Sequence, residues 1–249
     1  MNIENISQYI RSVELQRDRI SNFSEYPFCL SAVNNLFKLK FHPNVTFIVG
    51  ENGTGKSTIL EAIATVYGFN PEGGTKNFTF STKDTHSDLH NYIKLTKGIK
   101  KPQDGFFLRA ESFYNLATNI DELDKDGQGR KIIDFYGGCS LHEQSHGESF
   151  LALFLNKFKG KGIYILDEPE AALSPTRQMA MLARLHDLVK EGSQFIIATH
   201  SPIIISYPNS IIYEIKDGFN QVQYEQTEHY QVMRDFLNNT SKMLDILMD

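Results

Sequence analysis

Hydrophobic and polar positions alternate in a strand-and-helix pattern along most of the 249-residue chain. The early stretches YIRSVEL and FKLKF alternate as half-exposed strands do, whereas VTFIV at 45–49 is a continuous apolar run that is typical of a strand buried on both faces. In KSTILEAIATVYG, which follows a short glycine-rich turn, apolar residues recur at spacings of three and four. This spacing predicts a helix that stops at Gly68.

The second half of the chain repeats this order of elements. The pattern predicts a helix at 147–158, the strand GIYIL, a helix over 176–191, the strand QFIIAT and a hairpin that turns at Asp217 and Gly218. Strands that alternate with helices indicate an α/β fold with a mainly parallel central sheet. We expect the N-terminal strands and the late hairpin to add antiparallel strands to it, within a single domain over 1–249.

Residues 70–144 lack this regular pattern. Loops such as NPEGGTKNF and DELDKDGQG separate the apolar islands GFFL and FYNLA. A flexible linker would not carry such islands, so this range is predicted to form a lateral lobe inserted in the domain. A lysine cluster in it suits either contact with nucleic acid or a partner, or a plain solvated face. Its members are Lys94, Lys97, Lys100 and Lys101.

Composition narrows the class of protein without naming a partner. The net charge of -5 and the pI near 5.9 give no overall attraction to nucleic acid or to an anionic membrane, although a local basic patch remains compatible with them. The N-terminal stretch carries charges where a signal peptide has its apolar core, and the longest apolar run, FIIATHSPIII, is interrupted by His200 and Pro202. We expect a cytoplasmic protein with no membrane segment of its own and no structural disulfide between Cys29 and Cys139.

The stretch GENGTGKST matches the phosphate-binding pattern G-x-x-x-x-G-K-[ST] and lies between a predicted strand and a predicted helix. Its glycines allow backbone N–H groups to surround phosphate oxygens at the positive end of the helix. Lys56 is predicted to neutralise the β- and γ-phosphates of ATP, and the Ser57 hydroxyl to ligate Mg²⁺. The predicted nucleotide-binding residues here are Gly50, Glu51, Asn52, Gly53, Thr54, Gly55, Lys56, Ser57 and Thr58.

Two acids end the buried strand of GIYILDEPE. Asp167 and Glu168 would be costly to bury without a cation, and the nearest candidate is the Mg²⁺ held by Ser57. This assigns Asp167 to the metal and leaves Glu168 to polarise the attacking water. The alternative is an acidic N-terminus of the next helix.

His200 follows the strand QFIIAT, 32 residues after Glu168. In a parallel sheet it emerges at the same edge as the phosphate-binding loop, which predicts a residue that senses the γ-phosphate. The alternative is a structural histidine with satisfied hydrogen bonds.

Five motifs in order resemble the ABC-type ATPase superfamily: the Walker A loop at 50–57, a signature at 145–149, Walker B at 163–168, the D-loop region AALS and the H-loop THSP. The resemblance implies a head-to-tail dimer in which the signature of one chain caps the γ-phosphate of ATP bound to the other. The signature residues are Ser145, His146, Gly147 and Glu148. The same residues also read as a capping box, Ser145 with Glu148, before the helix FLALFL, and the two interpretations are compatible.

The variants SHGES, THSP and GENG look more like the RecF-, Rad50- and OLD-like branch of small predicted ATPases, including abortive-infection ATPases, than like transporters. This resemblance implies a soluble Mg-ATP-dependent dimer switch in nucleic-acid maintenance or phage defence, acting with an effector or nuclease. Two alternatives remain. One is the ATP-binding subunit of a membrane ABC transporter, and the other is a DNA- or RNA-binding ATPase stimulated by nucleic acid.

The sequence departs from the family pattern at two places. The expected Q-loop glutamine is missing after GFFL, where Arg109 and Glu111 stand, and Glu111 is either a substitute or a surface acid. Ser174 occupies the usual aspartate position of the D-loop. An aromatic residue that stacks on adenine is also expected before the Walker A loop. Tyr9, Tyr26 and Phe28 are candidates for it or simply core residues, and Tyr26 is the one we single out.

Overall fold

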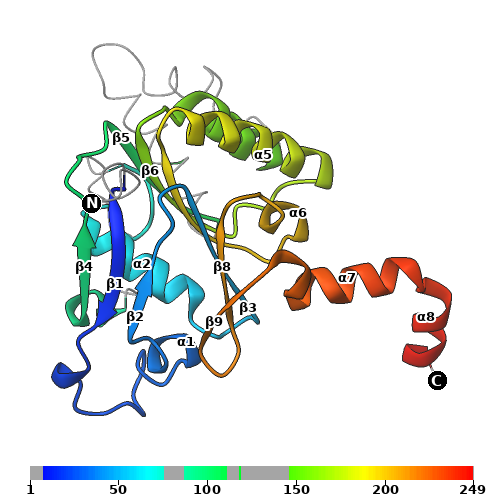
Figure 1. Cartoon of the computed structure of the whole chain (residues 1–249), viewed down its shortest axis with the longest axis horizontal. Coiled ribbons are helices and arrows are strands. Elements are labelled where there is room, and N and C mark those ends of the chain that lie inside the picture. Colours follow the sequence, from blue (N-terminus) through cyan, green and yellow to red (C-terminus); the bar gives the residue numbers. More distant parts are fainter. Residues whose placement is uncertain (1–7, 76–86, 111–117, 119–145, 249) are drawn as a thin grey trace.

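A six-stranded sheet in the order β5-β6-β7-β3-β8-β9 forms the centre of the molecule (Figure 1). The computed structural model describes residues 8–75, 87–110, 118 and 146–248. Neighbours from β5 to β8 pair in parallel, and β9 pairs with β8 antiparallel. The α/β fold with a mainly parallel sheet and a late hairpin is confirmed. The strands are β3 (Val45–Gly50), β5 (Asp104–Arg109), β6 (Gly162–Asp167), β7 (Gln194–Ala198), β8 (Ile211–Ile215) and β9 (Phe219–Val222).

Two long helices, α2 (Lys56–Tyr67) and α5 (Pro175–Lys190), cover opposite faces of this sheet. Every residue of β6 is buried, and its side chains alternate between two hydrophobic clusters. Tyr164 belongs to the cluster that contains Leu185 of α5, whereas Ile165 belongs to the cluster that contains Ile63 of α2. A strand with two apolar faces needs a cover on each, which explains the continuous apolar runs in the sequence.

The N-terminal strands form a second sheet and do not extend the central one. β1 (Ile10–Leu15) pairs antiparallel with β2 (Lys38–Lys40) on one side and with β4 (Ile93–Lys97) on the other. This corrects the expectation that they would add to the central sheet.

A buried glutamine side chain joins the two sheets. The Oε1 atom of Gln194, at the start of β7, accepts from the N–H groups of Tyr9 and Ile10 at 3.0 and 2.9 Å. Its Nε2 donates to the carbonyls of Ile10 and His42 at 2.8 and 2.9 Å. A side-chain amide thus satisfies backbone groups between the sheets that a neighbouring strand would otherwise satisfy.

Part of the range predicted to be a lateral lobe is built into both sheets. The short helix η3 (Asp88–Tyr92) leads into β4 of the second sheet, and β5 is the edge strand of the central one. The four lysines at 94, 97, 100 and 101 are exposed. The rest of the range lies outside the described residues, so the lobe stays a prediction.

The remaining helices agree with the sequence pattern where it predicted them. α4 (His146–Ala152) continues into a π-helical turn, η5 (Leu153–Lys157), where a helix at 147–158 was expected. Other short helices in the loops are η2 (Arg17–Arg19), α1 (Ser31–Asn34) and α6 (Pro202–Ile205).

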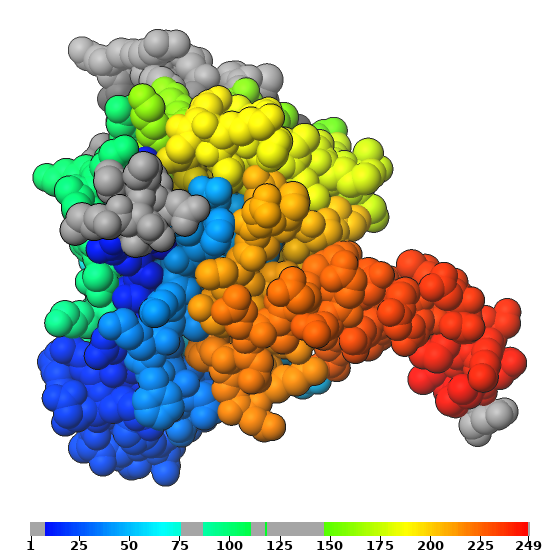
Figure 2. Space-filling view, in the orientation of Figure 1, coloured from blue at the N-terminus to red at the C-terminus, as the bar shows by residue number. Residues whose placement is uncertain are grey.

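After the hairpin, the chain forms η6 (Tyr224–Gln226), α7 (Glu228–Asn238) and α8 (Thr240–Met248). α7 and α8 stand out from the body as an arm, coloured orange to red in Figures 1 and 2. Neither helix contains a buried residue, so the arm is held to the body only near its start.

Replacing Gln194 with Leu tests the link between the sheets. Leu fills a similar volume but gives the N–H groups of Tyr9 and Ile10 no acceptor. We expect the free energy of unfolding to fall by about 2–4 kcal/mol, because each buried polar group left unsatisfied costs ~1–3 kcal/mol. Urea denaturation measures this change. The control Gln221→Leu, at an exposed position of β9, should change it by less than about 0.5 kcal/mol. Equal losses of unfolding free energy in the two variants would contradict the role of Gln194 in joining the sheets.

Candidate nucleotide-binding site

The glycine-rich loop connects β3 to α2, as the motif predicts. Gly55 takes the N-cap position with φ of 102°, a left-handed conformation that residues with a side chain rarely adopt. A Cβ atom there would also lie 3.1 Å from Cβ of Leu30. Glycine is therefore required both by the backbone and by the segment packed behind the loop, and the free N–H groups at the start of α2 are available to an anion.

Lys56 is a buried cation in this loop, with a relative exposure of 4%. Its Nζ donates to the carbonyls of Gly50 at 2.7 Å and Glu51 at 2.8 Å. Burial lowers the pKa of Lys56, while the carboxylates of Glu168 and Asp167 act in the opposite direction. A buried ammonium with three donors is suited to a phosphate oxygen, which restores the interactions it loses by leaving water.

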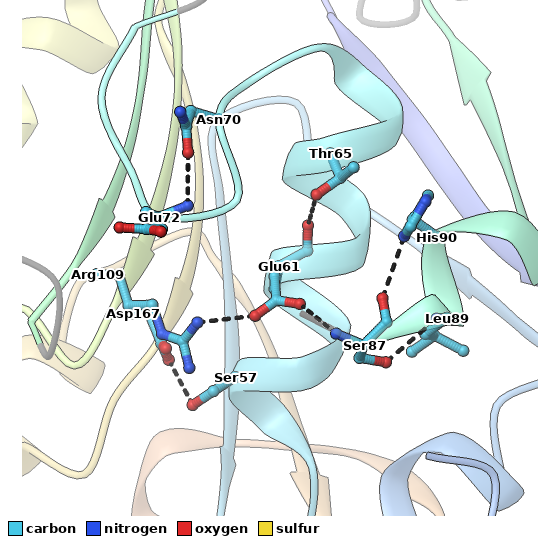
Figure 3. Close-up of polar contacts among 10 residues, drawn as sticks. All are labelled: Ser57, Glu61, Thr65, Asn70, Glu72, Ser87, Leu89, His90, Arg109 and Asp167. Atoms are coloured by element: carbon cyan, nitrogen blue, oxygen red, sulfur yellow. Dashed lines mark hydrogen bonds and ion pairs between the residues drawn. The ribbon is translucent and has the colours of Figure 1, made fainter. Parts of the chain in front are cut away.

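Ser57 and Asp167 meet as the sequence predicts. The Ser57 hydroxyl donates to Oδ1 of Asp167 at 3.0 Å, across 110 residues of sequence (Figure 3). Two ligands of an octahedral Mg²⁺ at right angles lie about 2.9 Å apart, given Mg–O distances of ~2.0–2.1 Å. The spacing of these two oxygens therefore fits residues that would hold Mg²⁺, which would supply positive charge to a bound phosphate. No cluster of three His, Cys, Asp or Glu residues in the described ranges offers a metal site of another kind.

Glu168 and His200 face each other beside this pair. Oε1 of Glu168 lies 3.6 Å from Nε2 of His200, longer than a hydrogen bond. Burial, together with the nearby Lys56 and His229, lowers the pKa of His200 to about 4, so the imidazole is neutral at pH 7. A neutral histidine can donate one N–H to a phosphate oxygen without adding charge to the site.

Glu170 is a residue of the site that the sequence analysis did not single out. Its Oε1 accepts from the backbone N–H of His200 at 2.5 Å, and burial raises its pKa. It therefore fixes the backbone of the H-loop to the turn after β6. The sequence signal was a third acid in DEPE, which looks the same as an acidic helix start.

The predicted signature lies at the start of α4 and is locked to the D-loop region. A Cβ atom on Gly147 would lie 2.4 Å from the carbonyl oxygen of Ala172, so only glycine fits there. Glu148 forms an ion pair of 3.0 Å with Arg177 of α5. Ser145 and the side chain of His146 are outside the described residues, so the capping box and the contacts with nucleotide stay predictions.

Arg109 forms an ion pair with an acid of α2. It donates from Nη1 to Oε2 of Glu61 at 2.7 Å and lies opposite Asp167 in the pairing of β5 with β6 (Figure 3). Glu61 also accepts from the backbone N–H of Ser87 at 3.1 Å. Glu111 lies outside the described residues, so what replaces the Q-loop glutamine stays open.

The aromatic candidates separate by burial. Tyr9 and Phe28 belong to the hydrophobic core, with relative exposures of 5% and 9%, whereas Tyr26 is 64% exposed. Only the last of these three has a ring face open to a base, and its role stays a prediction. Ser174 serves as the N-cap of α5, where its Oγ accepts from the N–H of Arg177 at 3.4 Å.

A cavity of about 820 Å³ opens beside the loop. Its wall combines the phosphate-binding loop and His200 with the turn of the β8–β9 hairpin and the first turns of α7. Sites for small molecules and cofactors typically measure about 300–1,000 Å³, so this cavity has the size of a small-molecule site. Lys56, Ser57 and Asp167 lie outside its wall.

A protein-family model described as an AAA domain matches residues 19–161, more than half of the chain. The chain belongs to the AAA domain family. It is similar to the cytochrome c biogenesis ATP-binding export protein CcmA of Legionella pneumophila, with 25% identity over 68% of this chain and 86% of the relative. The energy-coupling factor transporter ATP-binding protein EcfA1 of Fusobacterium nucleatum is 28% identical over 62% of each chain.

The chain spans only 24% of a third relative, the ABC transporter G family member STR2 of Medicago truncatula, at 24% identity. Among solved structures, an ATP-binding cassette of an ABC transporter in its ADP conformation has a TM-score of 0.51 at 16% identity and covers 97% of this chain and 98% of its own. The AAA domain and the ATP-binding relatives indicate an ATPase, and its fold is similar to that of an ATP-binding cassette. No helix in the described part of this ATPase is long and apolar enough to span a membrane.

Replacing Lys56 with Ala tests the phosphate site of this ATPase. The change removes the ammonium group that faces the loop, and hydrogen bonds to charged groups are worth ~1.5–3 kcal/mol, so we expect ATP to bind about 10- to 100-fold more weakly. Titration calorimetry with ATP measures the affinity. Lys190→Ala, at the exposed end of α5, should bind ATP as the wild type does. Unchanged affinity in Lys56→Ala would contradict the assignment of the loop.

Proposed function

We propose that this ATPase binds Mg-ATP at the edge of the sheet where β3, β6 and β7 end, and works as a head-to-tail dimer that closes on ATP and reopens after hydrolysis. The observation that carries the proposal is the 3.0 Å contact between Ser57 and Asp167, with Lys56, Glu168 and His200 around it. This is the set of groups that phosphoryl transfer to water requires.

Each residue has a distinct part in the reaction. Lys56 and the N–H groups at the start of α2 hold the phosphates, and Ser57 with Asp167 would hold Mg²⁺, which supplies positive charge to the phosphates when bound. Glu168 orients and polarises the attacking water. His200 donates a hydrogen bond to an oxygen of the γ-phosphate, because its imidazole is neutral and its Nε2 points to the side of Glu168.

The dimer follows from the resemblance to ABC-type ATPases, and the packing of the signature segment against its own chain supports it. Gly147 against Ala172 and Glu148 with Arg177 fix α4 to the D-loop region and to α5 of the same chain. A segment fixed in this way moves with the body of its own protomer, so it can close on the nucleotide of the partner as one unit.

The output of the switch is assigned to a partner protein. The variant motifs favour an effector or nuclease in nucleic-acid maintenance or phage defence, in the branch of RecF-, Rad50- and OLD-like ATPases, and this stays a prediction. A second candidate is the ATP-binding subunit of a transporter, favoured by the names of CcmA and EcfA1. Affinity purification with ATP bound distinguishes them: an integral membrane protein indicates the transporter, and a nuclease or toxin indicates the switch.

Glu168→Gln tests closure of the dimer. The amide keeps the shape of the side chain but cannot accept the proton of water, so ATP should persist and the dimer should accumulate. Size-exclusion chromatography with and without Mg-ATP measures the shift from monomer to dimer. The double variant Lys56→Ala/Glu168→Gln should stay monomeric, and Glu225→Gln, at an exposed site, should behave as the wild type. A Glu168→Gln protein that binds ATP yet stays monomeric would contradict the dimer.

Mixing two inactive variants tests whether the sites are shared. In Lys56→Ala the loop is damaged, and in Ser145→Arg an arginine obstructs the signature. A mixed dimer then contains one intact site and one site with both lesions. With equal random mixing and independent sites, hydrolysis should recover to roughly a quarter of the wild-type rate. The opposite result is that heterodimers form and bind ATP, but Ser145→Arg damages only the site that contains the phosphate-binding loop of the same chain. The signature would then act within one chain.

A further inference from the structure

His229, in the first turn of α7, reaches the nucleotide site from the C-terminal arm. Its Nε2 lies 3.0 Å from Nδ1 of His200, and the two ring centres are 5.1 Å apart. Both histidines line the cavity beside the phosphate-binding loop. The residue that is proposed to contact the γ-phosphate thus has a second histidine behind it.

The first turn of α7 is held firmly although the rest of the arm is exposed. Thr227 is fully buried and its Oγ1 caps the helix by accepting from the N–H of Tyr230 at 3.3 Å. The N–H of Glu228 donates to Oε1 of the buried Glu214 at 2.8 Å. Lys216 reaches both acids, Glu214 at 3.2 Å and Glu228 at 3.6 Å. His229 is therefore placed by the hairpin, which in turn pairs with β3.

A hydrogen bond between Nδ1 of His200 and Nε2 of His229 requires a proton on one of the two nitrogens and a lone pair on the other. Burial lowers the pKa of both histidines, to about 4 for His200, so both rings are neutral at pH 7. Either His229 donates from Nε2 to a bare Nδ1 of His200, or His200 donates from Nδ1 to a bare Nε2 of His229. In the first arrangement Nε2 of His200 carries an N–H and Nδ1 of His229 a lone pair. In the second arrangement these two are exchanged.

The surroundings of the outer nitrogen of His200 favour the first arrangement. Nε2 of His200 faces the Glu168 carboxylate at 3.6 Å, where an N–H is attracted and a lone pair is repelled. Nε2 of His200 and Nδ1 of His229 are both buried without a hydrogen-bond partner among the described residues, so either arrangement leaves one N–H without an acceptor. Only Nε2 of His200 has a carboxylate nearby to attract that N–H. When His229 donates, His200 carries its proton on Nε2 and the orphan nitrogen of His229 is a bare lone pair.

We propose that His229 is a positioning residue for ATP hydrolysis: it holds His200 as the Nε2–H tautomer, with the N–H directed to the side of Glu168 where the γ-phosphate binds. This inference rests on the proposed function, since it gives His200 that contact. His229 itself does not touch the nucleotide in this role. It acts through the orientation and tautomer of the ring in front of it.

The test compares His229→Leu, which removes the donor, with His229→Gln, whose amide N–H can still donate to Nδ1 of His200. We expect kcat for ATP hydrolysis to fall about 10- to 100-fold in His229→Leu, an effect of the size found for metal-ligating histidines that lose the partner fixing their tautomer. KM should change little, and His229→Gln should retain most of kcat. His186→Leu, which removes a histidine of α5 that contacts Tyr207, is the matched control and should leave both constants unchanged.

Two further measurements separate positioning from a loss of structure. Nitrogen NMR of the ¹⁵N-histidine-labelled protein without nucleotide should show His200 protonated on Nε2 in the wild type and in His229→Gln, but a mixture of tautomers in His229→Leu. In a His200→Gln background, His229→Leu should cause no further loss of kcat, because the residue it positions is gone.

The outcomes distinguish a failure of the role of His229 from a failure of the proposed contact between His200 and the γ-phosphate. If His200→Gln slows hydrolysis while His229→Leu keeps the wild-type kcat and tautomer, only the role of His229 is overturned. An additional loss of kcat from His229→Leu in the His200→Gln background also overturns it. If His200→Gln itself hydrolyses ATP at the wild-type rate, while Lys56→Ala fails to bind ATP, the contact of His200 with the γ-phosphate is wrong and the inference is withdrawn with it.

Discussion

The parallel pairing of β6, β7 and β3 determines where the charged groups of the nucleotide site lie. Ala198 of β7 stands opposite Asp167 of β6 and opposite Ile48 of β3. β6 and β7 therefore end at one level, and β3 continues two residues further, to Gly50. The strands are buried along their whole length, and Asp167 is the last residue of β6. The contact between Ser57 and Asp167 is a consequence of this register, because a shift by one residue would turn the carboxylate to the other face of the sheet.

The same edge gathers charges that need both parts of Mg-ATP. Asp167 and Lys56 are buried, and Glu168 and Glu170 lie close enough to Lys56 to affect its pKa. Carboxylates withdrawn from water require a cation or a proton, and the raised pKa of Glu170 shows the second response. Mg²⁺ would supply the cation to Asp167, while phosphate oxygens would supply the anion to Lys56. The site therefore matches a metal–polyphosphate pair better than either ion alone.

Local patterns predicted much of this molecule, and contacts across many residues account for what they missed. The buried strands, α2, α5 and the loop before Lys56 have periodic or fixed spacing that can be read from a short window. The separate N-terminal sheet depends on Gln194, a polar residue whose four hydrogen bonds reach back more than 150 positions. Glu170 and His229 belong to the site only because turns bring them to His200, 30 and 29 residues away. Neither has a spacing that marks it.

The backbone at Glu168 shows how the fold directs this carboxylate. Its φ of 50° is left-handed, a conformation that costs a residue with a side chain roughly 1 kcal/mol or more. The N–H of Glu168 donates to the carbonyl of Ala198 at 2.9 Å, continuing the β6–β7 pairing, and its own carbonyl accepts from Ala171 at 3.1 Å. These bonds offset the strain and break the strand's alternation just after Asp167. Consecutive acids of a regular strand would point to opposite faces of the sheet. The left-handed turn allows Asp167 to meet Ser57 while Glu168 faces His200, so one strand end directs two adjacent acids to two different partners.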